Sequence, residues 1–218
     1  MRRPDTVPVA APVPKPPALH DRALQDLSFI RKTMEGAASF TDVPGWGLAI
    51  AGVTALGAAA LAAQQTSAGA WLGVWIAEAV LAALLGGATM WRKMRRRAPA
   101  GSAPRLTVPA RKFLFGFWPA IGAGAVLTFA LTDPSTLLDP ASPIPQILPG
   151  LWLLLYGVGV LTAGAFSVRT VPLMGAGFMA LGALALLLRD LPGDLFLALG
   201  FGLLQLICGI IIARRHGG

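Results

Sequence analysis

Residues 195–213, LFLALGFGLLQLICGIIIA, decide the fold of this chain. The run contains one strongly polar side chain, Gln205, and no charged one, and Arg214 and Arg215 follow it directly. A helix of this length is roughly 28 Å long, close to the thickness of the hydrocarbon layer of a bilayer. Because lipid cannot hydrogen-bond to the backbone, a run that crosses it has to be helical. The stretch predicts a transmembrane helix.

Five apolar runs of similar length precede this one. The six predicted spans are about 46–63, 70–91, 113–131, 148–168, 172–188 and 195–213. The 218 residues are 55% apolar and only 13% charged, which is less polar than the solvated surface of a soluble domain requires. We predict an all-α membrane protein with six transmembrane helices in a domain at 44–215.

Charge predicts how these spans are oriented. Of the 18 Lys and Arg residues, only Arg189 lies in a connection that would face away from the others. Basic flanks of spans stay in the cytoplasm, so we expect both termini there and a multi-pass protein of the cytoplasmic (inner) membrane. The first 40 residues lack the apolar core of a signal peptide, so we expect the first span to direct insertion.

The densest basic segment is RKMRRRAPAGSAPR at 92–105. A nucleic-acid patch is one interpretation, but a topology determinant that contacts anionic lipid headgroups is favoured because the run directly follows a span. We expect no nucleic-acid partner. The candidate lipid-facing or partner-facing residues here are Arg92, Lys93, Arg95, Arg96 and Arg97.

The segment ahead of the first span divides in two. Residues 1–19 include PDTVPVAAPVPKPP and predict a disordered, proline-rich tail. Residues 20–40 predict a juxtamembrane amphipathic helix on the cytoplasmic side, either lying on the inner leaflet or docking a cytoplasmic protein partner. Its apolar face, with members three or four residues apart, comprises Leu24, Leu27, Ile30 and Met34.

The spans resemble one another in a common order. GVTALGAAAL at 52–61 is similar to GFMALGALAL at 177–186, and LPGLWLLLYGVG at 148–159 is similar to LPGDLFLALGFG at 191–202. These pairs predict three tandem two-helix hairpins, which would be parallel repeats. Frequent Gly and Ala residues favour a tight bundle over a wide pore and make a homo-oligomer a further expectation.

Residues that could carry enzyme chemistry are scarce. His20 and His216 lie near the termini, and Cys208 is the single cysteine. No metal-binding cluster or nucleophile–base pair can be assembled inside the spans from these residues. We therefore expect no enzymatic activity, no cofactor and no metal.

One carboxylate interrupts the apolar run VWIAEAVLAAL at 74–84. Glu78 would lie about 12 Å inside the membrane at 1.5 Å per residue, and three more polar side chains fall at similar or somewhat greater depth. These candidates are Tyr156, Thr162 and Gln205. Glu78 is either a neutral acid that donates to a backbone carbonyl or to Gln205, or a proton or cation site. The structural role is favoured because no other acid falls inside a predicted span.

FIRKTMEGAASFTDVPGWG at 29–47 and GLLQLICGIIIARRHGG at 202–218 resemble a family of uncharacterised bacterial six-span membrane proteins. The resemblance covers about 20–218 and implies membrane class and bacterial location, without an activity. We expect an accessory or regulatory membrane component without enzymatic activity. The alternative is a small proton-linked or cation-linked transporter or channel centred on Glu78.

Overall fold

The computed structural model describes residues 24, 26–30, 34, 44–97, 108–139, 141–165 and 167–216. The chain divides into Met1–Ala37 and Ala38–Gly218, which are described separately. In the described ranges every regular element is a helix, and six helical segments are long and apolar enough to cross a membrane. The predictions of an all-α chain and of six spans are confirmed in this respect.

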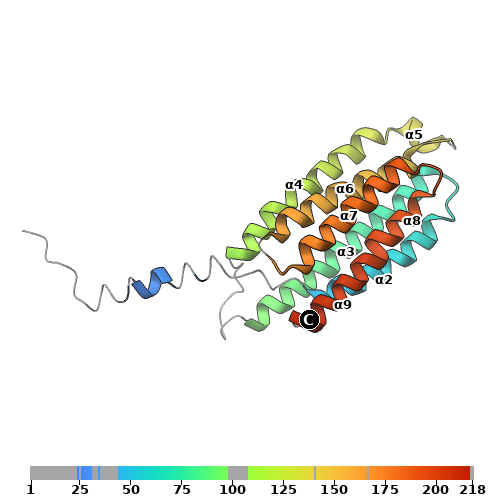
Figure 1. Cartoon of the computed structure of the whole chain (residues 1–218). Helices are drawn as coiled ribbons and strands as arrows, with labels where there is room; N and C mark the ends of the chain where they lie inside the picture. Colours follow the sequence, from blue (N-terminus) through green and yellow to red (C-terminus); the bar gives the residue numbers. More distant parts are fainter. Residues whose placement is uncertain are drawn as a thin grey trace, which may run out of the picture. The chain divides into compact units, whose positions relative to one another are not determined.

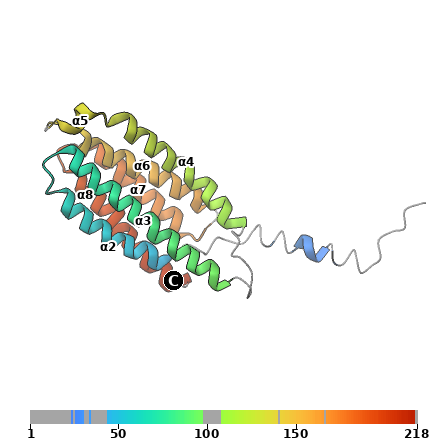
Figure 2. The same cartoon turned by 180° about the vertical axis from the view of Figure 1, so that it is seen from behind.

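The second unit is a bundle of helices that run side by side (Figures 1 and 2). The sixth span, Gly193–Arg215, is built from three consecutive elements: a short α-helix, a π-helix and a longer α-helix. The elements are α2 (Gly45–Ala62), α3 (Ala68–Arg97), α4 (Val108–Leu131), α5 (Pro134–Leu138), α6 (Ile144–Gly164), α7 (Thr170–Leu187), α8 (Gly193–Leu197), η1 (Ala198–Leu204) and α9 (Gln205–His216).

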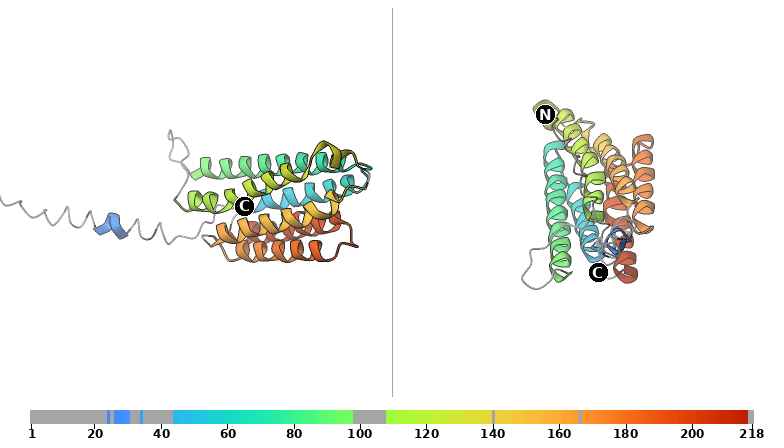
Figure 3. Two further views of the ribbon diagram at one scale, coloured as in Figure 1. Left: turned by 90° about the horizontal axis from the view of Figure 1, so that it is seen from above. Right: turned by 90° about the vertical axis from the view of Figure 1, so that its left-hand side faces the viewer.

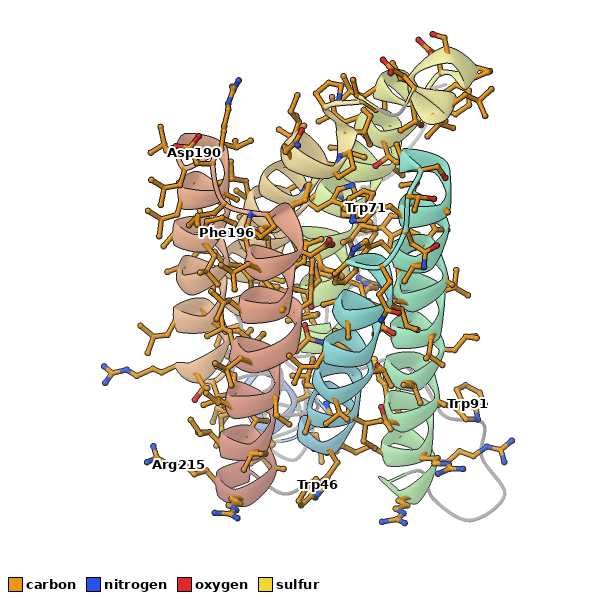
Figure 4. All side chains as sticks on the ribbon, turned by 90° about the vertical axis from the view of Figure 1, so that its right-hand side faces the viewer. Trp46, Trp71, Trp91, Asp190, Phe196 and Arg215 are labelled. Carbon is orange, nitrogen blue, oxygen red and sulfur yellow. The ribbon has the colours of Figure 1, made fainter. Side chains whose placement is uncertain are left out.

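The two ends of the bundle differ in charge. Trp46, Trp91 and Arg215 lie at one end, whereas Trp71, Asp190 and Phe196 lie toward the other (Figure 4). The first end carries nearly all the described basic residues of this unit and, within the described ranges, no acidic one, and we call it the basic end. The opposite end contains Arg189 and four aspartates. These are Asp133, Asp139, Asp190 and Asp194.

Glycines bring α6 and α7 into backbone contact. Gly150 and Gly157 lie two turns apart on α6, and Gly175 and Gly182 are spaced in the same way on α7. A Cβ on Gly182 would lie 2.6 Å from the Leu154 nitrogen, and one on Gly157 would lie 2.7 Å from the Met179 nitrogen. Any side chain at these positions would force the helices apart, so their spacing depends on glycine.

The same spacing joins α2 to the sixth span. Gly45 and Gly52 on α2 face Gly209 and Gly202, again in antiparallel order. A Cβ on Gly52 would lie 2.7 Å from the nitrogen of Leu206. These two closest helix pairs join different predicted hairpins, because α6 and α7 are spans four and five, and α2 pairs with span six.

The remaining two long helices lie outside these pairs. α4 packs mainly on α6, and its outward side chains are highly exposed: Phe129 is 86% exposed and Phe115 is 74% exposed. α3 packs on α2 and lies on the opposite side of the bundle from α7 in both views of Figure 3. In a bilayer, exposed aromatic and aliphatic side chains of this kind face lipid.

The first unit is described only in part. Residues 24, 26–30 and 34 are helical, and the four predicted apolar-face residues among them are all exposed. The proline-rich tail at 1–19 and the rest of 20–40 lie outside the described residues, so the amphipathic helix stays a prediction.

Candidate functional site

One face of α3 is turned toward the interior of the bundle in the N-terminal half of that helix. Its buried members are Ala68, Trp71, Trp75 and Glu78, which recur at spacings of three and four residues. This is the period of one helix face, so the carboxylate of Glu78 shares its face with two indoles. Glu78 is only 8% exposed.

Thr54 of α2 is the partner of Glu78. The Thr54 hydroxyl oxygen lies 2.8 Å from Glu78 Oε1 and 3.0 Å from the carbonyl oxygen of Ala51. A hydroxyl has one proton, so it donates either to an ionised Glu78 or to Ala51 while accepting from a protonated Glu78. The contact thus accommodates both charge states of the acid.

This partner differs from the two that the sequence suggested, a backbone carbonyl and Gln205. Thr54 is the only hydroxyl-bearing residue in α2, and that was the signal in the sequence that could have identified it. The pairing of α2 with α3 was needed to bring the two side chains together.

Gln205 lies at nearly the same level of the bundle as Thr54. The Gly52 contact with Leu206 and the Gly202 contact with Leu56 place the α2 segment 52–56 antiparallel beside 202–206. Gln205 is 5% exposed, and its Oε1 atom accepts no hydrogen bond from the described residues. An unpaired buried carbonyl oxygen is uncommon in proteins and calls for an explanation.

The sixth span changes its winding immediately before Gln205. The π-helix η1 covers Ala198–Leu204, and the amide nitrogen of Gln205 donates to the carbonyls of Gly200 and Gly202. π-Helical segments frequently occur at functional sites because they redirect side chains on the helix surface. Here the π-helix ends at Leu204, directly before Gln205, whose Oε1 atom accepts no hydrogen bond from the described residues.

The other two predicted polar candidates lie elsewhere. Tyr156 packs in an aromatic cluster, with its ring centroid 4.7 Å from that of Phe178 and 5.0 Å from that of Phe201. The Thr162 hydroxyl donates a hydrogen bond to the Gly116 carbonyl oxygen over 3.0 Å, at the contact between α4 and α6. The structure therefore brings Glu78 into contact with Thr54 and places Gln205 at a similar level on the sixth span, whereas Thr162 lies at the contact of α4 with α6.

A second carboxylate occurs in the sixth span and was missed from the sequence. The helix begins at Gly193, two residues before the predicted start, so Asp194 belongs to the span. Its Oδ1 atom accepts hydrogen bonds from Trp71 Nε1 at 2.7 Å and from Trp75 Nε1 at 3.0 Å. The premise that only one acid lies inside a span was wrong. Pro192 is the N-cap of this helix and Gly193 its first residue, and hydropathy alone misplaced the boundary because Pro, Gly and Asp are also typical of turns.

The basic candidates lie where α3 ends. Arg92, Lys93, Arg95 and Arg96 extend α3 past its apolar part, and the Arg95 guanidinium lies 5.3 Å from the centre of the Trp91 ring. Arg97 is the last residue of this helix. An indole next to arginines is typical of the interface between hydrocarbon and headgroups.

Within the described ranges, no group of three or more His, Cys, Asp and Glu side chains could hold a metal ion. The side-chain contact that the structure gives Glu78 is with the hydroxyl of Thr54. No family model matches the chain, and no curated protein or solved structure is significantly similar to it. The resemblance noted at 29–47 stays a prediction.

Proposed function

We propose that this chain is a non-enzymatic, accessory or regulatory protein of the bacterial inner membrane, with its basic end in the cytoplasm. The observation that carries the orientation is the segregation of charge along the bundle: within the described part of the second unit, only Arg189 among the basic residues lies away from the basic end. Basic flanks remain on the cytoplasmic side during insertion. We expect the predicted three-hairpin order to arise from successive insertion of helix pairs with this polarity.

The regulatory role is supported by the exposed apolar side chains ahead of the bundle. Phe29 and Met34 are 71% and 69% exposed within the described helical residues. Such side chains bind either the membrane surface or a protein partner. The glycine contacts of the bundle also favour a packed scaffold over a wide channel.

Single cysteines on a Cys208→Ala background test the orientation. Gln64→Cys lies in the α2–α3 connection and Ala165→Cys at the end of α6, and both native side chains are exposed. A membrane-impermeant maleimide should label the first in intact cells and the second only after permeabilisation. The reverse pattern would refute the proposed orientation.

Photo-crosslinking from positions 27 and 34 tests the regulatory role. A reactive amino acid at these exposed positions should form a defined protein adduct that a Phe29→Asp substitution removes. Adducts with lipid alone would assign the segment to the membrane surface and reject a docking function.

A second candidate, transport linked to protons or small cations, is favoured by Glu78 and Thr54. The 2.8 Å contact between them serves an ionised and a protonated carboxyl equally well, as a site that loads and releases a cation requires. Proteoliposomes under a pH gradient should show flux that Glu78→Gln abolishes and Asp133→Asn leaves unchanged. Absence of flux in the native protein would reject this candidate.

A further inference from the structure

We propose that Glu78 and Thr54 form a proton-binding site that opens toward the basic end of the bundle and is closed on the side of Trp75. The inference deepens the transport candidate by naming its ion and the direction of access, and it rests on that candidate only for movement of protons across the membrane. The site itself is argued from one hydrogen bond, from the burial of Glu78 and from the exposure of α3 on either side of it.

The contact with Thr54 provides a place for the proton. A proton on Glu78 Oε1 is donated to the Thr54 hydroxyl oxygen over 2.8 Å, and the Thr54 hydroxyl in turn donates to the Ala51 carbonyl oxygen over 3.0 Å. Both hydroxyl hydrogens then have an acceptor. When the proton leaves, the Thr54 hydroxyl turns to donate to the carboxylate, so the same side chain serves both charge states.

The surroundings of Glu78 favour the protonated form. The side chain is 8% exposed, and α2, which packs along α3, has no titratable residue. α5 and α6 also contact α3, and the one titratable side chain between them is Tyr156. Asp194, which reaches α3 through Trp71 and Trp75, would add only negative charge. An ionised Glu78 would therefore have one hydroxyl donor and no positive partner among the described residues, which is costly in apolar surroundings.

The half of α3 that precedes Glu78 closes the site. Trp71 is 3% exposed and Trp75 is 4% exposed, and both indoles donate to the same oxygen of Asp194. The Trp71 ring also lies parallel to that of Trp152 on α6. Side chains from three helices thus fill the space on this side, so we expect water to be excluded from Glu78 there.

Beyond Glu78 the corresponding side of α3 is open. Ala68 and Gly86 lie about five turns apart at 3.6 residues per turn, and therefore on the same side of the helix. Ala68 is 5% exposed, whereas Gly86 is half-buried and no atom of another helix lies within 4 Å of a Cβ placed on it. None of the residues 79–96 on α3 is buried. The helix is packed tightly as far as Glu78 and loosely after it, which leaves the half at the basic end as the route to the carboxyl.

Infrared difference spectroscopy of the purified full-length protein tests the protonation. At neutral pH the spectrum should contain a C=O band of a protonated carboxyl that is lost in Glu78→Gln and kept in Asp133→Asn, an exposed acid. Thr54→Val removes the acceptor and should move this band to higher frequency. A native spectrum that loses no such band in Glu78→Gln would overturn the site.

Exchange of the same carboxyl proton in heavy water tests the access. The band should shift quickly in the native protein and more slowly in Gly86→Leu, whose larger side chain fills the open space. Gly73→Leu is the matched control, because Gly73 also has nothing within 4 Å of its Cβ position but precedes Trp75. Exchange that slows in neither variant, or equally in both, would overturn the route.

Cysteine labelling in proteoliposomes, on the Cys208→Ala background, provides a second readout of access. A water-soluble thiol reagent present on both sides should modify Gly86→Cys but not Leu84→Cys, whose native side chain is 65% exposed on the other side of α3. Labelling of neither position, or of both, would overturn the opening toward the basic end. A protonated and exchangeable Glu78 without flux would uphold the site and reject transport alone.

Discussion

Trp71 and Asp194 are 123 residues apart in the sequence, yet Trp71 Nε1 donates to Asp194 Oδ1 over 2.7 Å. Trp75 donates to the same oxygen at 3.0 Å, and the Trp71 ring stacks on Trp152 of α6 at a centroid separation of 5.8 Å. The two indole bonds tie α3 to the start of the sixth span. A third helix, α6, joins them through the ring stack.

Removing the Asp194 carboxylate should destabilise the protein. Asp194→Ala leaves two buried indole N–H groups unpaired, and each costs about 1–3 kcal/mol. We expect a loss of about 2–4 kcal/mol in the free energy of unfolding, measured by denaturation in detergent with tryptophan fluorescence. Asp190→Ala, an exposed neighbour, is the control, and an equal loss in both variants would contradict the assigned role.

The glycine contact between α6 and α7 should not tolerate a methyl group. In Gly175→Ala the new Cβ would lie 2.6 Å from the Leu161 nitrogen, so the helices must separate, at a cost of about 1–3 kcal/mol. Gly57→Ala is the matched control because nothing lies within 4 Å of its Cβ position. That variant should be unchanged or up to about 1 kcal/mol more stable, since alanine favours helix. Equal behaviour of the two variants in thermal unfolding would refute the close approach.

Thr54 and Glu78 should be energetically coupled. A double-mutant cycle with Thr54→Val and Glu78→Gln should give an interaction free energy of about 0.6–1 kcal/mol, the usual worth of a hydrogen bond between membrane helices. Thr162→Val is the comparison, because Thr162 bonds to Gly116 and shares no partner with Glu78. Its effect should add to that of Glu78→Gln within about 0.5 kcal/mol. Coupling of similar size in both cycles would show that the Thr54 contact is not specific.

Asp133 should titrate abnormally in the connection between α4 and α6. The Ser135 hydroxyl, together with the amide and hydroxyl of Thr136, donates to this carboxylate and holds its pKa below the ordinary 3.8. Because the folded pKa is lowered, the stabilisation of α5 is present above the ordinary value and is lost as pH falls through the folded pKa. NMR titration of the Asp133 carboxyl should show this, with Ser135→Ala moving the pKa back upward. An unaltered pKa in that variant would exclude the Ser135 hydroxyl as the main cause.

The candidate site was only partly predictable from the sequence. Glu78 and Gln205 stand out because polar residues are rare in apolar runs. Thr54 did not, since threonine in a membrane helix usually bonds to its own backbone, as it also does here with Ala51. Asp194 was excluded because hydropathy placed the helix boundary one residue after it, and Trp71 and Trp75 gave no indication of a shared acceptor.

The sequence by itself determined that this chain has six helices long and apolar enough to cross a membrane. Span length is a local property, because about 20 apolar residues are needed to cross hydrocarbon and only a helix satisfies their backbone there. Only the tertiary structure decided which faces meet: the glycines of α6 against α7, those of α2 against the sixth span, and Thr54 against Glu78. Lipid and protein interior are both apolar, so hydropathy does not distinguish a face that meets lipid from one that meets another helix. That choice depends on close backbone packing and on hydrogen bonds between residues far apart in the chain.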